Sequence, residues 1–98
     1  MIRLHALFPV WEMKIGVAIA QFTIRKMKTR WGSCSPAAKS IRINVALIKQ
    51  PPECLEYIVV HELVHLLEPS HNQRFVALMD NFLPQWRAYR SQLNAALS

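Results

Sequence analysis

The sequence contains little glycine, little cysteine and few acidic residues. Only two of its 98 residues are glycine and two are cysteine, whereas 52% are hydrophobic. This composition excludes a flexible linker or disordered tail and indicates one globular domain spanning residues 1–98. Two cysteines, Cys34 and Cys54, are too few for a disulfide framework, and no secretory signal is recognisable. We therefore expect free thiols and a cytoplasmic location.

Long apolar runs are also missing. The longest uncharged run in the first half extends from Ile15 to Ile24, about half of what a bilayer span requires. A second apolar stretch, around Ile58, is interrupted by His61 and Glu62. We therefore expect no membrane-spanning segment. Internal repeats and low-complexity segments are absent too, which favours a single domain.

Acidic residues are outnumbered two to one. Six Asp and Glu stand against twelve Lys and Arg, for a formal net charge of +6. Such an excess favours anionic partners such as nucleic acid or acidic substrates. A cluster of basic residues is by itself weak evidence of nucleic-acid binding, because the solvated faces of strands have the same composition. Nucleic-acid binding is therefore a secondary hypothesis. The clustered basic residues are Arg25, Lys26, Lys28, Arg30, Lys39 and Arg42.

Two runs in the first half have the composition of strands. Gly16 to about Trp31 is rich in apolar and β-branched residues, and Ser40 to Leu47 alternates strictly between apolar and polar positions. The intervening Gly32 to Pro36 is rich in turn formers, so the simplest pairing is an antiparallel hairpin with a loop there. The first thirteen residues fit no single element.

The second half reads as three helices. Pro51 and Pro52 suit a helix start, so the first helix is expected from about Pro52 to Leu67, where Pro69 ends it. Ser70 to Gln73 fits a capping box for the second helix. A third amphipathic helix follows Pro84. The sequence thus predicts an α+β fold, with a small antiparallel β-sheet or hairpin followed by three helices.

The first predicted helix carries the motif HELVH. Apolar residues surround this helix on nearly all sides, so His61, Glu62 and His65 are expected to be buried and to need partners. His61 and His65 are four residues apart and project from one face, about 6 Å apart along the axis. Glu62 lies about 100° round the helix axis from His61 and borders the place where the two imidazoles would meet a metal ion. This HExxH arrangement binds zinc through its histidines, and its glutamate acts as general base on a zinc-bound water.

A catalytic zinc requires a third protein ligand and one open position. His71 is the leading candidate, because it follows the break at Glu68 and Pro69, where the chain can return to the metal. Glu68, Glu56 and Asp80 are alternative carboxylate ligands. His5 is expected to be unrelated to the site.

The stretch from about Met27 to Leu93 resembles the YgjP-like metallopeptidase family and, more distantly, the SprT-like zincins. The resemblance rests on KMKTRWGSC, IRIN, EYIVVHELVHLLEPSHNQRF and LPQW, which occur in this order. It implies a zincin active-site helix, the zinc ligands His61, His65 and His71, and Glu62 as catalytic base. Family members are usually longer at the N-terminus, which makes residues 1–14 a candidate remnant of a longer part.

The sequence therefore indicates hydrolysis of peptide or protein substrates at a zinc ion. The alternative is a non-enzymatic, zinc-stabilised module that binds nucleic acid through a basic hairpin, although such a module needs no base beside the metal. A protease recruited to DNA, as in SprT-like relatives, combines the two.

Four further residues have candidate roles. Asn44, on the strand before the metal-bearing helix, is a candidate substrate contact if that strand pairs with an extended substrate. Tyr89 is a candidate for stabilising the oxyanion. Trp31 and Gly32 are expected to be structural, as a core plug and a tight turn. Cys34 is not expected to act as a fourth ligand, because a zinc with four protein ligands is closed to catalysis.

Overall fold

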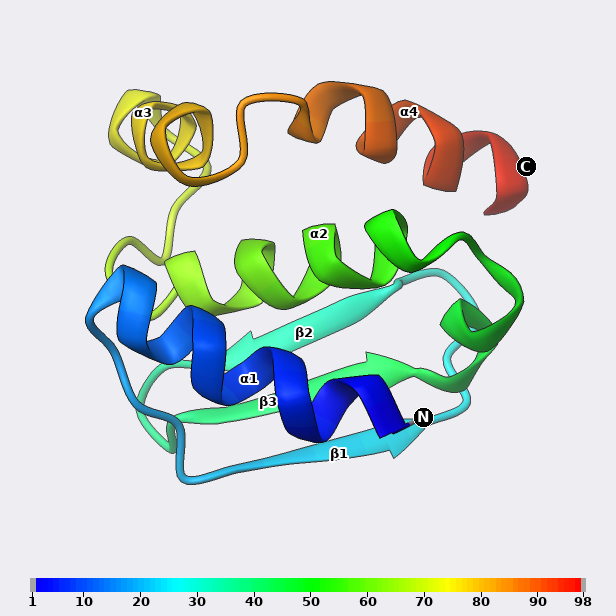
Figure 1. Cartoon of the computed structure of the whole chain (residues 1–98), viewed down its shortest axis with the longest axis horizontal. Coiled ribbons are helices and arrows are strands. Elements are labelled where there is room, and N and C mark those ends of the chain that lie inside the picture. The colour runs from blue at the N-terminus through cyan, green and yellow to red at the C-terminus, as the bar shows by residue number, and fades with distance from the viewer. Residues whose placement is uncertain (1, 98) are drawn as a thin grey trace.

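The computed structural model describes residues 2–97, which form four α-helices, one 3-10 helix and one three-stranded sheet (Figure 1). The expected α+β fold class is confirmed. In chain order the elements are α1 (Ile2–Ile15), β1 (Gln21–Arg25), β2 (Gly32–Ser35), β3 (Ser40–Asn44), η1 (Val45–Lys49), α2 (Pro52–Val64), α3 (Gln73–Phe82) and α4 (Trp86–Leu97).

The sheet is mixed, with strand order β1-β3-β2. β2 pairs antiparallel with β3, whereas β1 pairs parallel with β3 in a register that places Phe22 opposite Ile41. The expected antiparallel pairing of the first run with Ser40 to Leu47 is therefore wrong. The predicted loop Gly32 to Pro36 instead contains β2, and the chain must cross over before it forms this strand.

Alternation along β3 determines which face of the sheet is buried. Ile41 and Ile43 are fully buried on the helix side, whereas Arg42 between them is exposed. The predicted strand ends early, at Asn44, because the Asn44 side chain accepts a hydrogen bond from the Ala46 amide and caps η1.

Helix α1 is the element that the sequence left unassigned. Pro9 lies inside it and lowers the helical signal. Its buried residues nevertheless recur with helical spacing, and the ring of Phe8 stacks on Phe22 of β1 at 4.6 Å between centroids. The helix ends at Gly16, whose φ of +84° is the left-handed conformation that favours glycine. The buried face consists of Leu4, Phe8, Trp11 and Ile15.

Helix α2 is the centre of the domain. It lies between the sheet on one side and α3 and α4 on the other, and α1 runs beside it (Figure 1). Val59, Val60, Leu63 and Val64 are completely buried, as expected for a helix that is apolar on nearly all sides. This position places the residues of the HELVH motif at fixed points of the core.

The two C-terminal helices are joined to each other by side-chain hydrogen bonds. Asp80 near the end of α3 accepts from the indole N–H of Trp86 at 2.8 Å and from Arg87 at 2.6 Å, both at the start of α4. Helix α3 is capped by Asn72, whose side chain accepts from the Phe75 amide, and not by Ser70 as the sequence predicted.

Within residues 2–97, no helix is both long and apolar enough to cross a membrane.

Candidate metal centre

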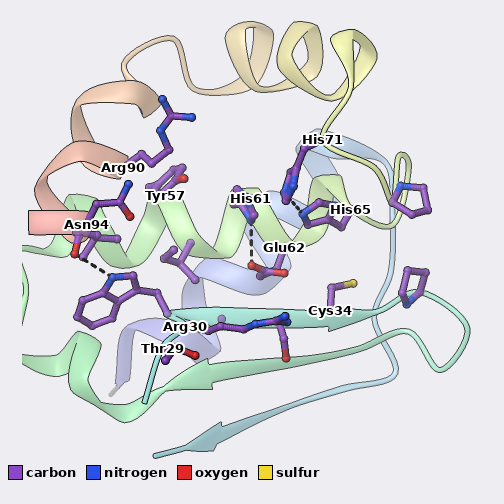
Figure 2. Close-up of a pocket in the computed structure, with 17 residues that line it drawn as sticks. Thr29, Arg30, Cys34, Tyr57, His61, Glu62, His65, His71, Arg90 and Asn94 are labelled. Atoms are coloured by element: carbon purple, nitrogen blue, oxygen red, sulfur yellow. Dashed lines mark hydrogen bonds and ion pairs between the residues drawn. The ribbon is translucent and has the colours of Figure 1, made fainter. Parts of the chain in front are cut away.

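Two segments bring the three candidate ligands together. His61 and His65 stand one turn apart on α2, and His71 lies in the short connection between α2 and α3. Beyond Val64 the chain turns, and the Glu68 amide still bonds to the Val64 carbonyl. The turn reverses the chain, so that His71 comes back over the end of α2 (Figure 2).

The three imidazoles converge on one point. One ligand nitrogen from each of His61, His65 and His71 lies within 4.8 Å of the others, and no other group of this kind occurs among the described residues. The Nε2 atoms of His65 and His71 are 3.0 Å apart. Ligand nitrogens of a tetrahedral zinc are separated by roughly 3.3 Å, given Zn–N bonds of about 2.0–2.1 Å. The three side chains therefore fit a small metal ion that imidazole binds well.

The His65 ring is held in the tautomer that metal binding needs. Its Nδ1–H donates to the Glu68 carbonyl at 3.1 Å, which leaves Nε2 without a proton and directed at His71. Burial, followed by the neighbouring His61, lowers the pKa of His65. A neutral imidazole oriented by a backbone carbonyl is the usual state of a histidine ligand.

Among residues 2–97, Glu62 is the only carboxylate that lines the cavity beside these histidines. It is 4% exposed and accepts a hydrogen bond from Nδ1 of His61 at 3.0 Å. Gly32 of β2 lies directly against it, because a Cβ at residue 32 would stand 3.3 Å from Glu62 Cγ and 2.9 Å from Ile58 Cγ2. Gly32 is therefore needed for close approach of β2 to α2, and not for the tight turn that the sequence suggested.

The alternative carboxylate ligands are engaged elsewhere. Glu68 accepts from the Ser70 amide and from Arg74. Glu56 accepts from the indole of Trp11 at 2.9 Å, and Asp80 joins α3 to α4. His5 lies on α1 against the ring of Phe22, outside the histidine group.

The histidine cluster opens into a cavity of about 550 Å³. Its walls come from α2, from β2 with the residues just before it, and from α4 (Figure 2). The sequence did not identify several polar residues of this cavity. Tyr57 could have been found, because it lies one turn before His61 on α2 and therefore on the same helical face. The polar residues that the sequence did not identify are Thr29, Arg30, Ser33, Tyr57, Arg90 and Asn94.

Cys34 lines this cavity and forms no disulfide with the other described cysteine, Cys54. Burial and then the negative charge of Glu62 raise the pKa of Cys34 to about 11. The thiol therefore stays protonated near neutral pH and is a poor nucleophile. Cys34 also lies outside the group of converging histidines. The second cysteine, Cys54, is completely buried in α2, as expected of a small hydrophobic residue.

The structure contradicts the assignment of Asn44 as a substrate contact. Asn44 belongs to β3, which is paired on both sides within the domain, so no substrate strand adds there. Asn44 is 1% exposed, and its side-chain amide donates to the carbonyls of Met27 and Arg30 at 2.9 and 2.7 Å. These bonds fix the connection between β1 and β2, which is a structural role.

Trp31 has the structural role that the sequence predicted. Its ring is buried, and its indole N–H donates to the Leu93 carbonyl of α4 at 3.1 Å. Trp31 thus links the strand at the floor of the cavity to the helix that forms its far wall.

The basic residues named from the sequence do not share one hairpin. Arg25 ends β1, Lys39 lies in the turn between β2 and β3, and Arg42 points from β3 away from the helices. Arg30 alone of the six lines the cavity. Neither these described residues nor the comparisons below provide evidence of a nucleic-acid site.

A cluster of three histidines, two of them on the central helix α2, is an arrangement expected of a metallopeptidase. The family described as the YgjP-like metallopeptidase domain matches residues 1–96, and the chain therefore belongs to this family.

Solved structures share the fold. The metallopeptidase zymogen abylysin of Pyrococcus abyssi is 20% identical, with a TM-score of 0.84 over 95% of this chain and 93% of that chain. The zymogen jannalysin of Methanocaldococcus jannaschii is 22% identical, with a TM-score of 0.79 over 96% of both chains. The search of curated proteins found no match.

Proposed function

We propose that this domain hydrolyses peptide bonds with a zinc ion held by His61, His65 and His71 and with Glu62 as general base. The observation that carries the proposal is the convergence of three imidazoles within 4.8 Å, next to a buried carboxylate and at the wall of a cavity. A catalytic zinc site has three protein ligands and one side open to a cavity, whereas a structural zinc site is closed by four protein ligands.

Glu62 would move the proton in this reaction. A zinc ion bound to the histidines would supply Lewis acidity for the scissile carbonyl and the attacking water. Glu62 would take a proton from the water while the water oxygen bonds to the carbonyl carbon. Glu62 would then give this proton to the leaving amine as the C–N bond breaks. Its packing against Gly32 and its bond to His61 limit the positions of the carboxylate.

An extended substrate would bind along β2. This strand is an edge of the sheet, because it pairs only with β3, and Gly32, Ser33 and Cys34 line the cavity. Its free N–H and C=O groups are suited to pair with a peptide main chain. We therefore propose that a substrate strand lies beside β2, one strand away from the position that the sequence suggested.

Tyr57 is better placed than Tyr89 to stabilise the oxyanion. The Tyr89 hydroxyl donates to Gln85, the residue just before α4, at 3.2 Å, and Tyr89 does not line the cavity. Tyr57 lines the cavity, and its ring lies edge-on to His61 at 5.7 Å between centroids. Burial raises the pKa of Tyr57 to about 12, so its hydroxyl keeps the proton that it would donate.

Hydrolysis of a peptide library by the zinc-loaded protein tests this function. Glu62→Gln preserves the shape of the side chain and removes the base, so we expect zinc binding and fold to persist while the rate falls by about 10²–10⁴-fold. Mass spectrometry of the products gives the rate, and metal analysis of the same samples is the control. A variant with intact zinc and a rate within a few-fold of the wild type would refute the role of Glu62.

We also propose that the domain acts in the cytoplasm. The support is that both cysteines, Cys34 and Cys54, are free thiols, which is usual in a reducing compartment.

A further inference from the structure

The charges that line the cavity are unbalanced. Two arginines, Arg30 and Arg90, line it together with a single carboxylate, Glu62. Glu62 accepts a hydrogen bond from His61 and, under the proposed function, serves as the base. Among the described residues no other acidic side chain lines the cavity to neutralise the two arginines, which are both exposed. A cleft lined by an excess of one sign of charge concentrates its field on an anion.

The two arginines differ in the contacts that their guanidinium groups make within the protein. The Arg90 guanidinium lies over the ring of Trp86, 5.0 Å from its centroid, on the same helix. The guanidinium of Arg30 has no ion pair, hydrogen bond or ring contact with any residue of the described range 2–97. Five N–H donors in the wall of a cleft are therefore available to a ligand.

The main chain of Arg30 is nevertheless firmly held. Its carbonyl accepts from Asn44 Nδ2 at 2.7 Å, and the carbonyl of the next residue, Trp31, accepts from the Asn44 amide at 2.9 Å. Trp31 itself is buried and bonded to α4. In Figure 2 Arg30 lies on the β2 side of the cavity, across from Tyr57 and His61 of α2. The side chain thus starts from a fixed point beside the edge where a substrate strand would lie.

We propose that Arg30 binds a carboxylate of the substrate and makes the enzyme selective for peptides with negative charge close to the cleaved bond. This inference rests on the proposed function. A guanidinium fork matches a carboxylate with two parallel hydrogen bonds, which a lysine cannot reproduce. The carboxylate belongs either to an Asp or Glu side chain or to the C-terminus of the peptide, and the two sources share the same chemistry.

Matched substrates separate these two sources. Once a library has located a cleaved bond, three fluorogenic peptides are compared: a neutral amidated peptide, the same peptide with Glu for Gln beside the bond, and the neutral peptide shortened to a free C-terminal carboxylate there. For the wild type we expect kcat/KM to be about ten- to a hundredfold higher for a carboxylate peptide than for the neutral one, mainly through KM. The peptide that gains identifies the source of the carboxylate.

Variants of the zinc-loaded chain then assign the preference to Arg30. In Arg30→Gln the kcat/KM of the carboxylate peptide divided by that of the neutral peptide should fall to about one. In Arg30→Lys this ratio should lie between the values of Arg30→Gln and the wild type. Arg42→Gln is the matched control: it removes one charge from an exposed position that does not line the cavity and should keep the wild-type ratio. Melting temperatures verify that each variant is folded.

The outcomes are separable from those of the proposed function. Equal cleavage of the three peptides by the wild type, or a preference that survives in Arg30→Gln, would overturn the role of Arg30. If the zinc-loaded protein cleaves no peptide at all, the proposed function fails instead. The carboxylate preference is then measured as equilibrium binding to zinc-loaded Glu62→Gln of three new peptides of equal length: one neutral and amidated, one amidated with a central Glu, and one neutral with a free C-terminal carboxylate. Equal Kd values would overturn the role of Arg30.

Discussion

At the scale of single residues, the site is predictable where its geometry is local. The spacing of His61 and His65 places them on one helical face, with Glu62 about 100° round the helix, whatever the rest of the chain does. His71 was also identified, because Pro69 forces the chain to leave the helix and lets it return. The structure brings the three histidines together, and their binding of zinc remains a prediction.

Asn44 shows why non-local roles escape the sequence. Its partners, the carbonyls of Met27 and Arg30, are 17 and 14 residues away. Alternation places its side chain on the polar face of a strand, but cannot indicate that a loop folds back to cover it. The residue therefore suggested a substrate contact, whereas it is buried and stabilises the loop.

Replacing Asn44 should consequently affect stability. Asn44→Ala removes two donors and the acceptor of the Ala46 amide from a buried position, which should lower the free energy of unfolding by roughly 2–4 kcal/mol. Urea denaturation measures this change. Arg42→Ala, at an exposed position of the same strand, should stay within about 0.5 kcal/mol of the wild type. An Asn44→Ala variant as stable as Arg42→Ala would show that these hydrogen bonds contribute little.

At the scale of elements, the helices were easier to predict than the strands. α2, α3 and α4 follow from apolar periodicity and from the prolines that separate them, and their bounds agree with the prediction to within a few residues. The strands are short, and their pairing depends on contacts that no local pattern specifies. For this reason the sequence predicts a long first strand antiparallel to β3 and a loop at residues 32–36, whereas β1 is short and parallel to β3 and β2 occupies residues 32–35. Pro9 concealed α1.

The joint between α3 and α4 should make stability depend on pH. The hydrogen bond from Arg87, and then that from Trp86, hold the pKa of Asp80 below its ordinary value of 3.8. Because the folded pKa is the lower one, the stabilisation is complete above about pH 4 and is lost as the pH falls through the folded pKa. Asp80→Asn should thus melt below the wild type at pH 7, and the difference should shrink under strongly acidic conditions.

Thermal denaturation between pH 2 and pH 7 tests this expectation. Arg87→Gln is the matched partner variant and should show the same trend, with little further loss in the double variant. A difference in melting temperature that does not change with pH would mean that the charge of Asp80 is not the cause.

At the scale of the whole molecule, the domain is organised around α2. The sheet packs on one side of this helix, α3 and α4 on the other, and the cavity is bounded by elements from both layers (Figure 1). The three histidines join α2 to the start of the α3 layer, so a bound metal would connect two layers of a small core. The α+β class was predictable from composition and order of elements. The meeting of the wall that contains Arg30 with the wall that contains Arg90 depends on how the layers pack.

The zinc content of four purified proteins tests the central claim most directly. Native mass spectrometry of the wild type should show one zinc per chain, because three imidazoles of suitable geometry converge on one point. His61→Ala, His65→Ala and His71→Ala should each lose the metal under the same conditions. Full zinc occupancy in His61→Ala or His65→Ala, or a wild type that binds no zinc, would contradict the account.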